Sequence, residues 1–304
     1  MSPPSASPRG AAAALTVALA VMVAWGSTPV LTRIAVEELE PLVVAVLRTV
    51  LAGLVAAPIL LATRQRLPVV TRARGLLLVS AVTGFVAFPV LFTLGQERTS
   101  ATHGALILAA LPVFTGAYAA FVARRRPSRP WLVGCTVALA GEAAVVAIRS
   151  GGGEAEPSLA GDLLVLASAL LVSAGYVAGA LLGQQGYRSV STTFWGVAIG
   201  AVIVAPLALG LLADGLPSAG ADAWAAVVFL ALVTSIVGYV GWYWALARGG
   251  IARVATLQFV QPLSGIVLAA LVLGERVTAP LALAAAVVLA GVWIVQRGAT
   301  AARA

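Results

Sequence analysis

Apolar runs follow one another from residue 11 to residue 296, separated by short segments rich in Gly, Pro and Arg. A helix needs about 20 predominantly apolar residues to cross a bilayer. The pattern therefore predicts an all-α integral membrane protein with ten transmembrane helices. Their expected ranges are 11–32, 42–62, 75–95, 101–122, 131–149, 160–182, 192–213, 223–246, 251–273 and 278–296.

The chain repeats itself with an offset of 150 residues. Pro112 corresponds to Pro262, Pro130 to Pro280, and the segment VALAG at 137–141 to VVLAG at 287–291. Five helices are an odd number, so the second copy must lie upside down in the membrane. We therefore expect two inverted five-helix repeats, 11–149 and 161–297, joined by a polar extracytoplasmic linker at 150–160. Such halves supply inward-open and outward-open arrangements of similar energy.

Composition and charge set the class and the orientation. Hydrophobic residues make up 61% of the chain and charged residues 10%, against about a quarter in a soluble domain. All 19 basic residues are Arg, dispersed over short loops, which indicates membrane topology and not a nucleic-acid surface. With the N-terminus inside, only Arg33, Arg98, Arg149 and Arg276 fall outside. Tails 1–10 and 298–304 are therefore expected in the cytoplasm.

Two prolines indicate where a cargo binds. A proline inside a helix leaves the carbonyl four residues earlier without its hydrogen bond, so Pro112 frees Leu108 and Pro262 frees Gln258. Breaks at corresponding places in two halves are typical of a binding site at the membrane midplane. We expect the cargo site beside these two breaks.

Several residues resemble a known family. Trp25-Gly26-Ser27-Thr28-Pro29, Arg48 and Pro112 resemble one half of an EamA-type member of the drug/metabolite transporter superfamily. Gly161-Asp162-Leu163-Leu164, Gln261-Pro262-Leu263 and Leu273-Gly274-Glu275-Arg276 resemble the other half. The resemblance implies ten helices in two inverted repeats in a bacterial cytoplasmic membrane. It also implies export of amino acids, related metabolites or toxic compounds, with protons as the coupling ion. The first half departs from the pattern, with Ala123-Arg124-Arg125-Arg126 in place of Gly-Glu-Arg.

Polar and aromatic side chains at helical spacing are candidates for the substrate pathway, because polar faces in a bilayer turn toward the bundle interior or a water-filled cavity. Helix-to-helix packing by Ser and Thr is the alternative for any one hydroxyl. The candidates are Trp25, Thr28, Arg48, Pro112, Thr115, Tyr118, Tyr176, Tyr239, Trp242, Gln258, Gln261 and Pro262.

Three of the ionisable residues inside the expected helices are candidates for a role in binding or in proton transfer. Arg48 and Glu142 lie at compatible depths, so either they pair, or Glu142 carries a coupling proton while Arg48 receives an anionic group of the cargo. Arg48 packing against backbone carbonyls is the alternative. His103, the single histidine, is of a residue type that changes charge near neutral pH, but its position favours a wetted interfacial site.

The sequence also limits the chemistry. A P-loop requires Lys, which the chain lacks, and no metal-ligand cluster, cofactor motif or catalytic triad is present. We therefore expect no enzyme and no cofactor. The leading prediction is a secondary transporter, acting as an exporter by alternating access, with a small-molecule substrate, the lipid bilayer and protons as partners, and with homodimer formation left open. An importer of the same fold, an intramembrane enzyme and a membrane receptor are the alternatives.

Overall fold

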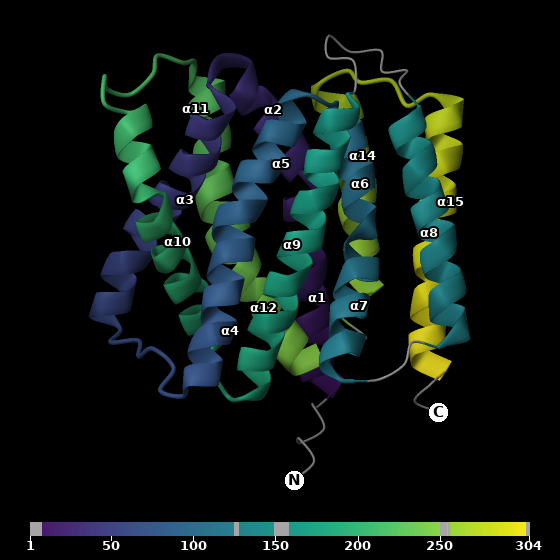
Figure 1. Ribbon diagram of the computed structural model, residues 1–304, viewed down its shortest axis with the longest axis horizontal. Helices are drawn as coiled ribbons and strands as arrows, with labels where there is room; N and C mark the ends of the chain where they lie inside the picture. Colours follow the sequence, from purple (N-terminus) through teal and green to yellow (C-terminus); the bar gives the residue numbers. More distant parts are fainter. Residues whose placement is uncertain (1–7, 125–127, 149–157, 250–253, 255, 302–304) are drawn as a thin grey trace.

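The structure is a computed structural model that describes residues 8–124, 128–148, 158–249, 254 and 256–301. All regular structure in these ranges is helical. Seven helical segments are long and apolar enough to cross a membrane, and 260–272 and 279–291 are shorter apolar helices. The helices stand roughly side by side as a single bundle (Figure 1). The start of α1 (Pro8–Gly26) and the end of α15 (Ala279–Ala301) lie at the same end of this bundle, at the bottom of Figure 1.

The first apolar run is longer than predicted and is broken. After α1 the chain turns at Ser27 and continues as α2 (Thr28–Glu38), beyond the expected end at residue 32. The break follows from Pro29, which has no N–H to continue the helical hydrogen-bond ladder. Ser27 Oγ donates to Ala24 O over 2.6 Å. The turn therefore lies next to Trp25 and Thr28, two of the expected pathway residues.

The third and eighth apolar runs each contain a π-helical turn, in which the chain is wound more loosely. In the first half α4 (Thr71–Ala81) leads through η1 (Val82–Ala87) into α5 (Phe88–Glu97). In the second half α11 (Ala221–Phe229) leads through η3 (Leu230–Val237) into α12 (Gly238–Gly249). Such turns interrupt the regular i→i−4 ladder and occur often at functional sites. They fall at corresponding places in the two halves.

The fourth apolar run shows how the chain accommodates Pro112. It consists of α6 (Ala101–Ile107), a 3₁₀ turn η2 (Leu108–Ala110) and α7 (Leu111–Val122). The Leu108 carbonyl was expected to be free, but it accepts the N–H of Leu111 within the tighter turn. That expectation is therefore wrong. The ninth run has a matching 3₁₀ turn η4 (Thr256–Phe259) before α14 (Val260–Val272).

Two helix pairs form the edges of the bundle. The pair α3 (Pro41–Ala62) and α10 (Ser189–Leu211) lies at one edge, the pair α8 (Arg129–Ala147) and α15 lies at the other, and α9 (Leu159–Gln184) lies between them (Figure 1).

The contacts between α8 and α15 are reciprocal and very close. A Cβ placed on Gly141 would lie 2.7 Å from the Val288 N atom, and a Cβ placed on Gly291 would lie 2.7 Å from the Ala138 Cα atom. Both glycines and both partners are related by the offset of 150 residues. Each half therefore contributes a glycine that packs against the equivalent residue of the other half.

Candidate functional site

An aromatic cluster occupies the interior of the bundle. It consists of Trp25 on α1, Tyr176 on α9, and Tyr239 and Trp242 on α12, all at most 4% exposed. Trp25 and Tyr176 each lie next to the other three rings, with centroids 5.2–6.2 Å apart, and Trp25 stacks on Tyr176 with an angle of 10° between the rings. Sequence spacing had selected all four. The structure brings three different helices together through them.

Two members of the aromatic cluster donate hydrogen bonds to the two π-helical turns. The Trp25 indole Nε1 donates to Thr234 O over 2.9 Å, and the Tyr239 hydroxyl donates to Gly84 O over 3.2 Å. Gly84 and Thr234 correspond to each other across the offset of 150 residues. Each π-helical turn therefore has a backbone carbonyl that accepts a hydrogen bond from an aromatic side chain of the opposite half.

Arg48 lies buried beside the second π-helical turn. Its Nε donates to Ser235 Oγ and its Nη2 donates to Thr234 Oγ1, each over 2.9 Å. Its guanidinium also lies 5.6 Å from the centroid of the Phe88 ring. The side chain is 2% exposed and its Nη1 atom has no hydrogen-bond partner.

No described residue forms an ion pair with Arg48. The ion pairs in the described part of the chain are Arg33 with Glu37, Arg98 with Glu97, and His103 with Asp162. A charged side chain inside a membrane is costly and normally has a partner or faces a cavity. This arrangement leaves a guanidinium donor available for an anionic group.

The region of the two prolines is also buried and polar. Pro112, Gln258, Gln261 and Pro262 are all buried, and neither amide atom of the Gln258 side chain has a hydrogen-bond partner. Ser173 Oγ on α9 lies 3.4 Å from Leu111 O. A buried amide without a partner is expensive in an apolar medium, so Gln258 offers a donor and an acceptor to a ligand.

Three further candidates lie on α2 and α7. Thr28 is buried at the start of α2, and Thr115 and Tyr118 are half-buried on α7. The side chain of Glu142 lies outside the described residues, but its helix α8 and the helix of Arg48, α3, stand at opposite edges of the bundle (Figure 1). The helix positions therefore argue against an Arg48–Glu142 ion pair.

His103 corrects another expectation. It was predicted to be a wetted interfacial residue, but it is 1% exposed, and its Nδ1 lies 3.5 Å from Oδ2 of the fully buried Asp162. The other oxygen, Oδ1, accepts from Thr99 Oγ1 over 2.5 Å. Asp162 lies on α9, about 60 residues further along the chain, and α9 packs against the helix of His103, α6. Nearby, Glu275 accepts the backbone N–H groups of Ala101 and Thr102, each over 2.8 Å.

Sequence reasoning missed part of this site. Phe85 and Tyr243 extend the aromatic cluster, with centroids 4.5 Å and 5.8 Å from the Tyr239 ring. Tyr239 and Tyr243 are four residues apart on one helical face, a spacing that identifies Tyr243 as a neighbour. Thr234 had no comparable local signal, and Asp162 appeared only as part of the family resemblance, because the partners of both residues come from distant helices.

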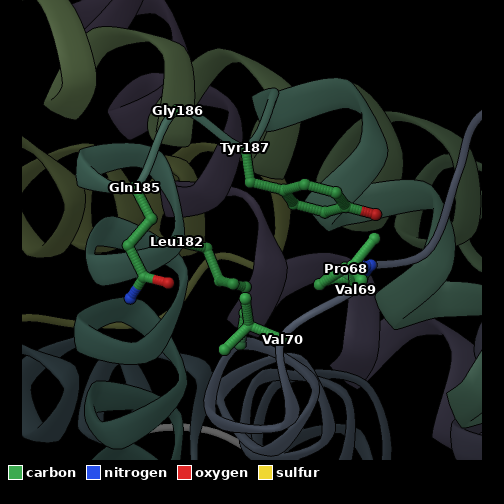
Figure 2. A pocket seen from close by; sticks show the side chains of 8 residues that line it. Pro68, Val69, Val70, Leu182, Gln185, Gly186 and Tyr187 are labelled. Carbon is green, nitrogen blue, oxygen red and sulfur yellow. The ribbon is translucent and has the colours of Figure 1, made fainter.

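A separate small cavity of about 200 Å³ lies at the end of the bundle that carries the chain termini. Its lining residues come from the loop before α4, the first turn of α4, the end of α9 and the turn that follows α9; Figure 2 shows the side chains around it. Tyr187 packs there and donates its hydroxyl to Arg66 O over 2.6 Å. Burial raises the pKa of Tyr187 to about 12. This cavity does not contact the aromatic cluster among the described residues.

The described residues offer little to a metal or a nucleophilic mechanism. They contain no group of three or more His, Cys, Asp or Glu side chains close enough to hold a metal ion. The single cysteine, Cys135, is buried on α8. The chemistry of the site is that of binding: aromatic faces, a guanidinium and amide groups.

Several known proteins resemble this chain in sequence. A transporter of Bacillus subtilis, YdeK, is 32% identical over 263 residues, which cover 85% of this chain and 88% of that protein. A protein of Streptantibioticus cattleyicolor named "Probable terminal-alkyne amino-acid exporter" is 31% identical, covering 74% of this chain and 75% of its own. A protein of Salmonella typhimurium named "Probable amino-acid metabolite efflux pump" is 30% identical, covering 91% and 92%.

A solved crystal structure has the same fold, with a TM-score of 0.66, 18% identity, and coverage of 96% of this chain and 99% of that one. The EamA-like transporter family matches the sequence twice, over residues 12–147 and 159–297. These two matches together span nearly all of the helical bundle. The chain therefore belongs to the EamA-like transporter family and is a multi-pass membrane transporter, not an enzyme.

Proposed function

We propose that this protein is a secondary active exporter of a small carboxylate-bearing metabolite across the bacterial cytoplasmic membrane. In this proposal ten transmembrane helices form two inverted five-helix repeats, with both chain ends in the cytoplasm. The two halves rock about the aromatic cluster, so that the site opens alternately to either side of the membrane.

Contacts between the halves support the inverted arrangement. The pairs Gly141–Val288 and Gly291–Ala138 are exchanged by the offset of 150 residues, as a two-fold relation between the halves requires. The helices that carry them, α8 and α15, run in opposite directions (Figure 1). The carbonyls of Gly84 and Thr234 follow the same relation.

The observation that carries the substrate class is the environment of Arg48. A buried guanidinium with a free Nη1, two hydroxyl partners and no described acidic partner fits a carboxylate, which accepts hydrogen bonds from a guanidinium in a planar, paired geometry. The surrounding rings fit an apolar side chain. An amino acid with an apolar side chain combines both features. Two relatives are named for amino acids or their metabolites, which agrees with this class.

The direction of transport is proposed from the relatives' names, since one is named an exporter and another an efflux pump. An importer with the same fold would use the same site under a different gradient. Glu142 as a proton carrier and the homodimer stay predictions.

The test is counterflow in proteoliposomes that contain the purified protein. Vesicles loaded with an unlabelled apolar amino acid, such as L-leucine, are placed in a trace of the labelled compound, and label accumulation is followed. Saturable exchange supports a carrier. Flux that grows linearly with concentration and does not depend on the internal amino acid contradicts alternating access. A panel of amino acids, nucleosides and sugars identifies the class, and exchange of neutral sugars without amino acids would refute the role given to Arg48.

A further inference from the structure

We propose that the small cavity at the end of the bundle that carries the chain termini binds an anionic phospholipid. In this proposal arginines hold the phosphate, and the cavity holds part of an acyl chain. The cavity lies between the loop before α4 and the first turn of α4, in the first half, and the end of α9 with the turn after it, in the second half. Its lining residues include none of the aromatic cluster or of the two proline breaks. The proposal therefore concerns a second site, beyond the cargo site.

The cavity has apolar walls and is large enough for a hydrocarbon segment. All of its lining residues except Gln185 and Gly186 are Pro, Val, Ala, Leu or Tyr, and Figure 2 shows their side chains around it. Its volume of about 200 Å³ exceeds the roughly 150 Å³ of an apolar cavity that accommodates benzene. Several methylene groups of an acyl chain therefore fit inside.

Positive charge surrounds the cavity, and no acidic residue balances it. The segments 41–96 and 163–213, which contain the cavity and its flanks, have no Asp or Glu. Exposed arginines lie beside the cavity in both segments, among them Arg66, Arg74 and Arg188. None of these three takes part in an ion pair within the described part of the chain. A basic pocket between transmembrane helices attracts anionic lipid headgroups.

The three arginines adjoin residues that line the cavity. Tyr187 donates its hydroxyl to Arg66 O over 2.6 Å, and Arg188 is the next residue in the chain. Arg74 Nε donates to Pro68 O over 2.8 Å. These contacts hold the loop of the first half against the turn of the second half, so the arginines and the cavity are arranged before a ligand binds. Guanidinium groups suit a phosphate because they can donate two parallel hydrogen bonds to its oxygens.

Exposed apolar side chains in the same loop favour a lipid over a soluble anion. Leu67, Val69 and Val70 follow Arg66 and are 43%, 85% and 64% exposed. At a membrane surface, apolar side chains lie among the acyl chains while arginines reach the headgroups. A phospholipid matches both kinds of group, whereas inorganic phosphate would leave the apolar side chains and the cavity uncovered.

The test is lipid binding to the purified, delipidated protein in detergent, followed by native mass spectrometry. The wild type should bind phosphatidylglycerol about tenfold or more tightly than zwitterionic phosphatidylethanolamine. Affinity for phosphatidylglycerol should fall about fivefold for each arginine removed in the double variant Arg66→Gln, Arg188→Gln. The hydrogen bonds described for these two residues use their backbone carbonyls, so the double variant keeps them. Arg129→Gln, at an exposed position at the same end but on the opposite edge of the bundle, is the matched control and should bind as the wild type does (Figure 1).

A second variant tests the cavity itself. Ala73→Leu fills part of the cavity and should weaken binding of phosphatidylglycerol about tenfold or more, as expected when two methylene groups lose their burial. Thermal unfolding without lipid shows whether this variant folds, and if it does not, the arginine variants decide. Glycerol 1-phosphate, which has the phosphate but no acyl chain, should compete with phosphatidylglycerol about 100-fold more weakly.

Three results would overturn the proposal. The first is equal affinity of the wild type for the two lipids, and the second is unchanged affinity for phosphatidylglycerol in the double variant. The third is displacement of phosphatidylglycerol by an equal concentration of glycerol 1-phosphate, which would identify a site for a soluble anion.

Discussion

Replacing Arg48 by Gln should weaken binding of the cargo far more than it weakens the fold. The substitution removes a buried charge together with its hydrogen bonds to Thr234 and Ser235. Removing a charge from the centre of the membrane should stabilise the fold by about 3 kcal/mol. Losing two hydrogen bonds to a charged group should destabilise it by about 3 to 6 kcal/mol. Both hydroxyls still donate to Leu230 O, so neither is left without a partner. The expected loss of stability is therefore about 0 to 3 kcal/mol.

The effect on binding has a different size and a chemical signature. Truncating one partner of a buried, hydrogen-bonded charge pair costs about 2 to 5 kcal/mol, which is a loss of roughly 30-fold or more in affinity. This loss should apply to L-leucine, which carries a carboxylate, and not to L-leucinamide, which lacks that charge. The dissociation constant of L-leucinamide divided by that of L-leucine should be well above one in the wild type and should fall toward one in Arg48→Gln.

The assay is calorimetry or ligand-induced thermal shift on the purified protein in detergent. Arg72→Gln, at an exposed position on α4, is the matched control and should bind both compounds as the wild type does. Thermal unfolding of each variant without ligand reports the change in stability separately. An equal loss of affinity for the acid and the amide would refute the carboxylate role, because a merely structural arginine affects both compounds alike.

Three further substitutions test other parts of the structure by thermal unfolding. Trp25→Phe removes the donor to Thr234 O and should cost about 1 to 3 kcal/mol, the penalty of an unsatisfied buried carbonyl; an unchanged melting temperature would contradict that hydrogen bond. Gly291→Ala should separate α15 from α8 and cost about 1 to 3 kcal/mol, whereas Gly210→Ala, where a Cβ meets nothing within 4 Å, should be neutral or slightly stabilising. Glu275→Gln should cost about 1 kcal/mol, because one amide oxygen replaces two carboxylate oxygens at the start of α6; equal stability would show that the cap is unimportant.

The hydropathy pattern predicted much of the helical layout. The run expected at 101–122 begins and ends in the structure at those residues, as α6, η2 and α7. The run expected at 42–62 begins one residue earlier, at Pro41. This agreement has a physical reason, because apolar length is what a bilayer selects and loops rich in Gly and Arg end each run. Spacing on helical faces also selected Trp25, Tyr176, Tyr239 and Trp242, which the structure brings together in the interior of the bundle.

The local windings and the long-range polar contacts could not be predicted. The segments 82–87 and 230–237 are ordinary apolar sequences, and the donors to their Gly84 and Thr234 carbonyls come from the opposite half of the chain. The burial of His103 likewise depends on a helix about 60 residues away. A single sequence, analysed in short windows, does not indicate which distant helices contact one another.

The exchange of aromatic donors between the π-helical turns makes the two halves unequal as well as interdependent. The Thr234 carbonyl binds an indole from the first half, while the Gly84 carbonyl binds a phenol from the second half. Position 175, which corresponds to Trp25, is Gly, and position 89, which corresponds to Tyr239, is Pro. By the same two-fold relation, a homodimer of the first half alone would present two indoles to its two carbonyls, and a homodimer of the second half alone would present two phenols. The two halves have therefore diverged, because each supplies a different ring from a different position, and the native pairing combines one indole with one phenol.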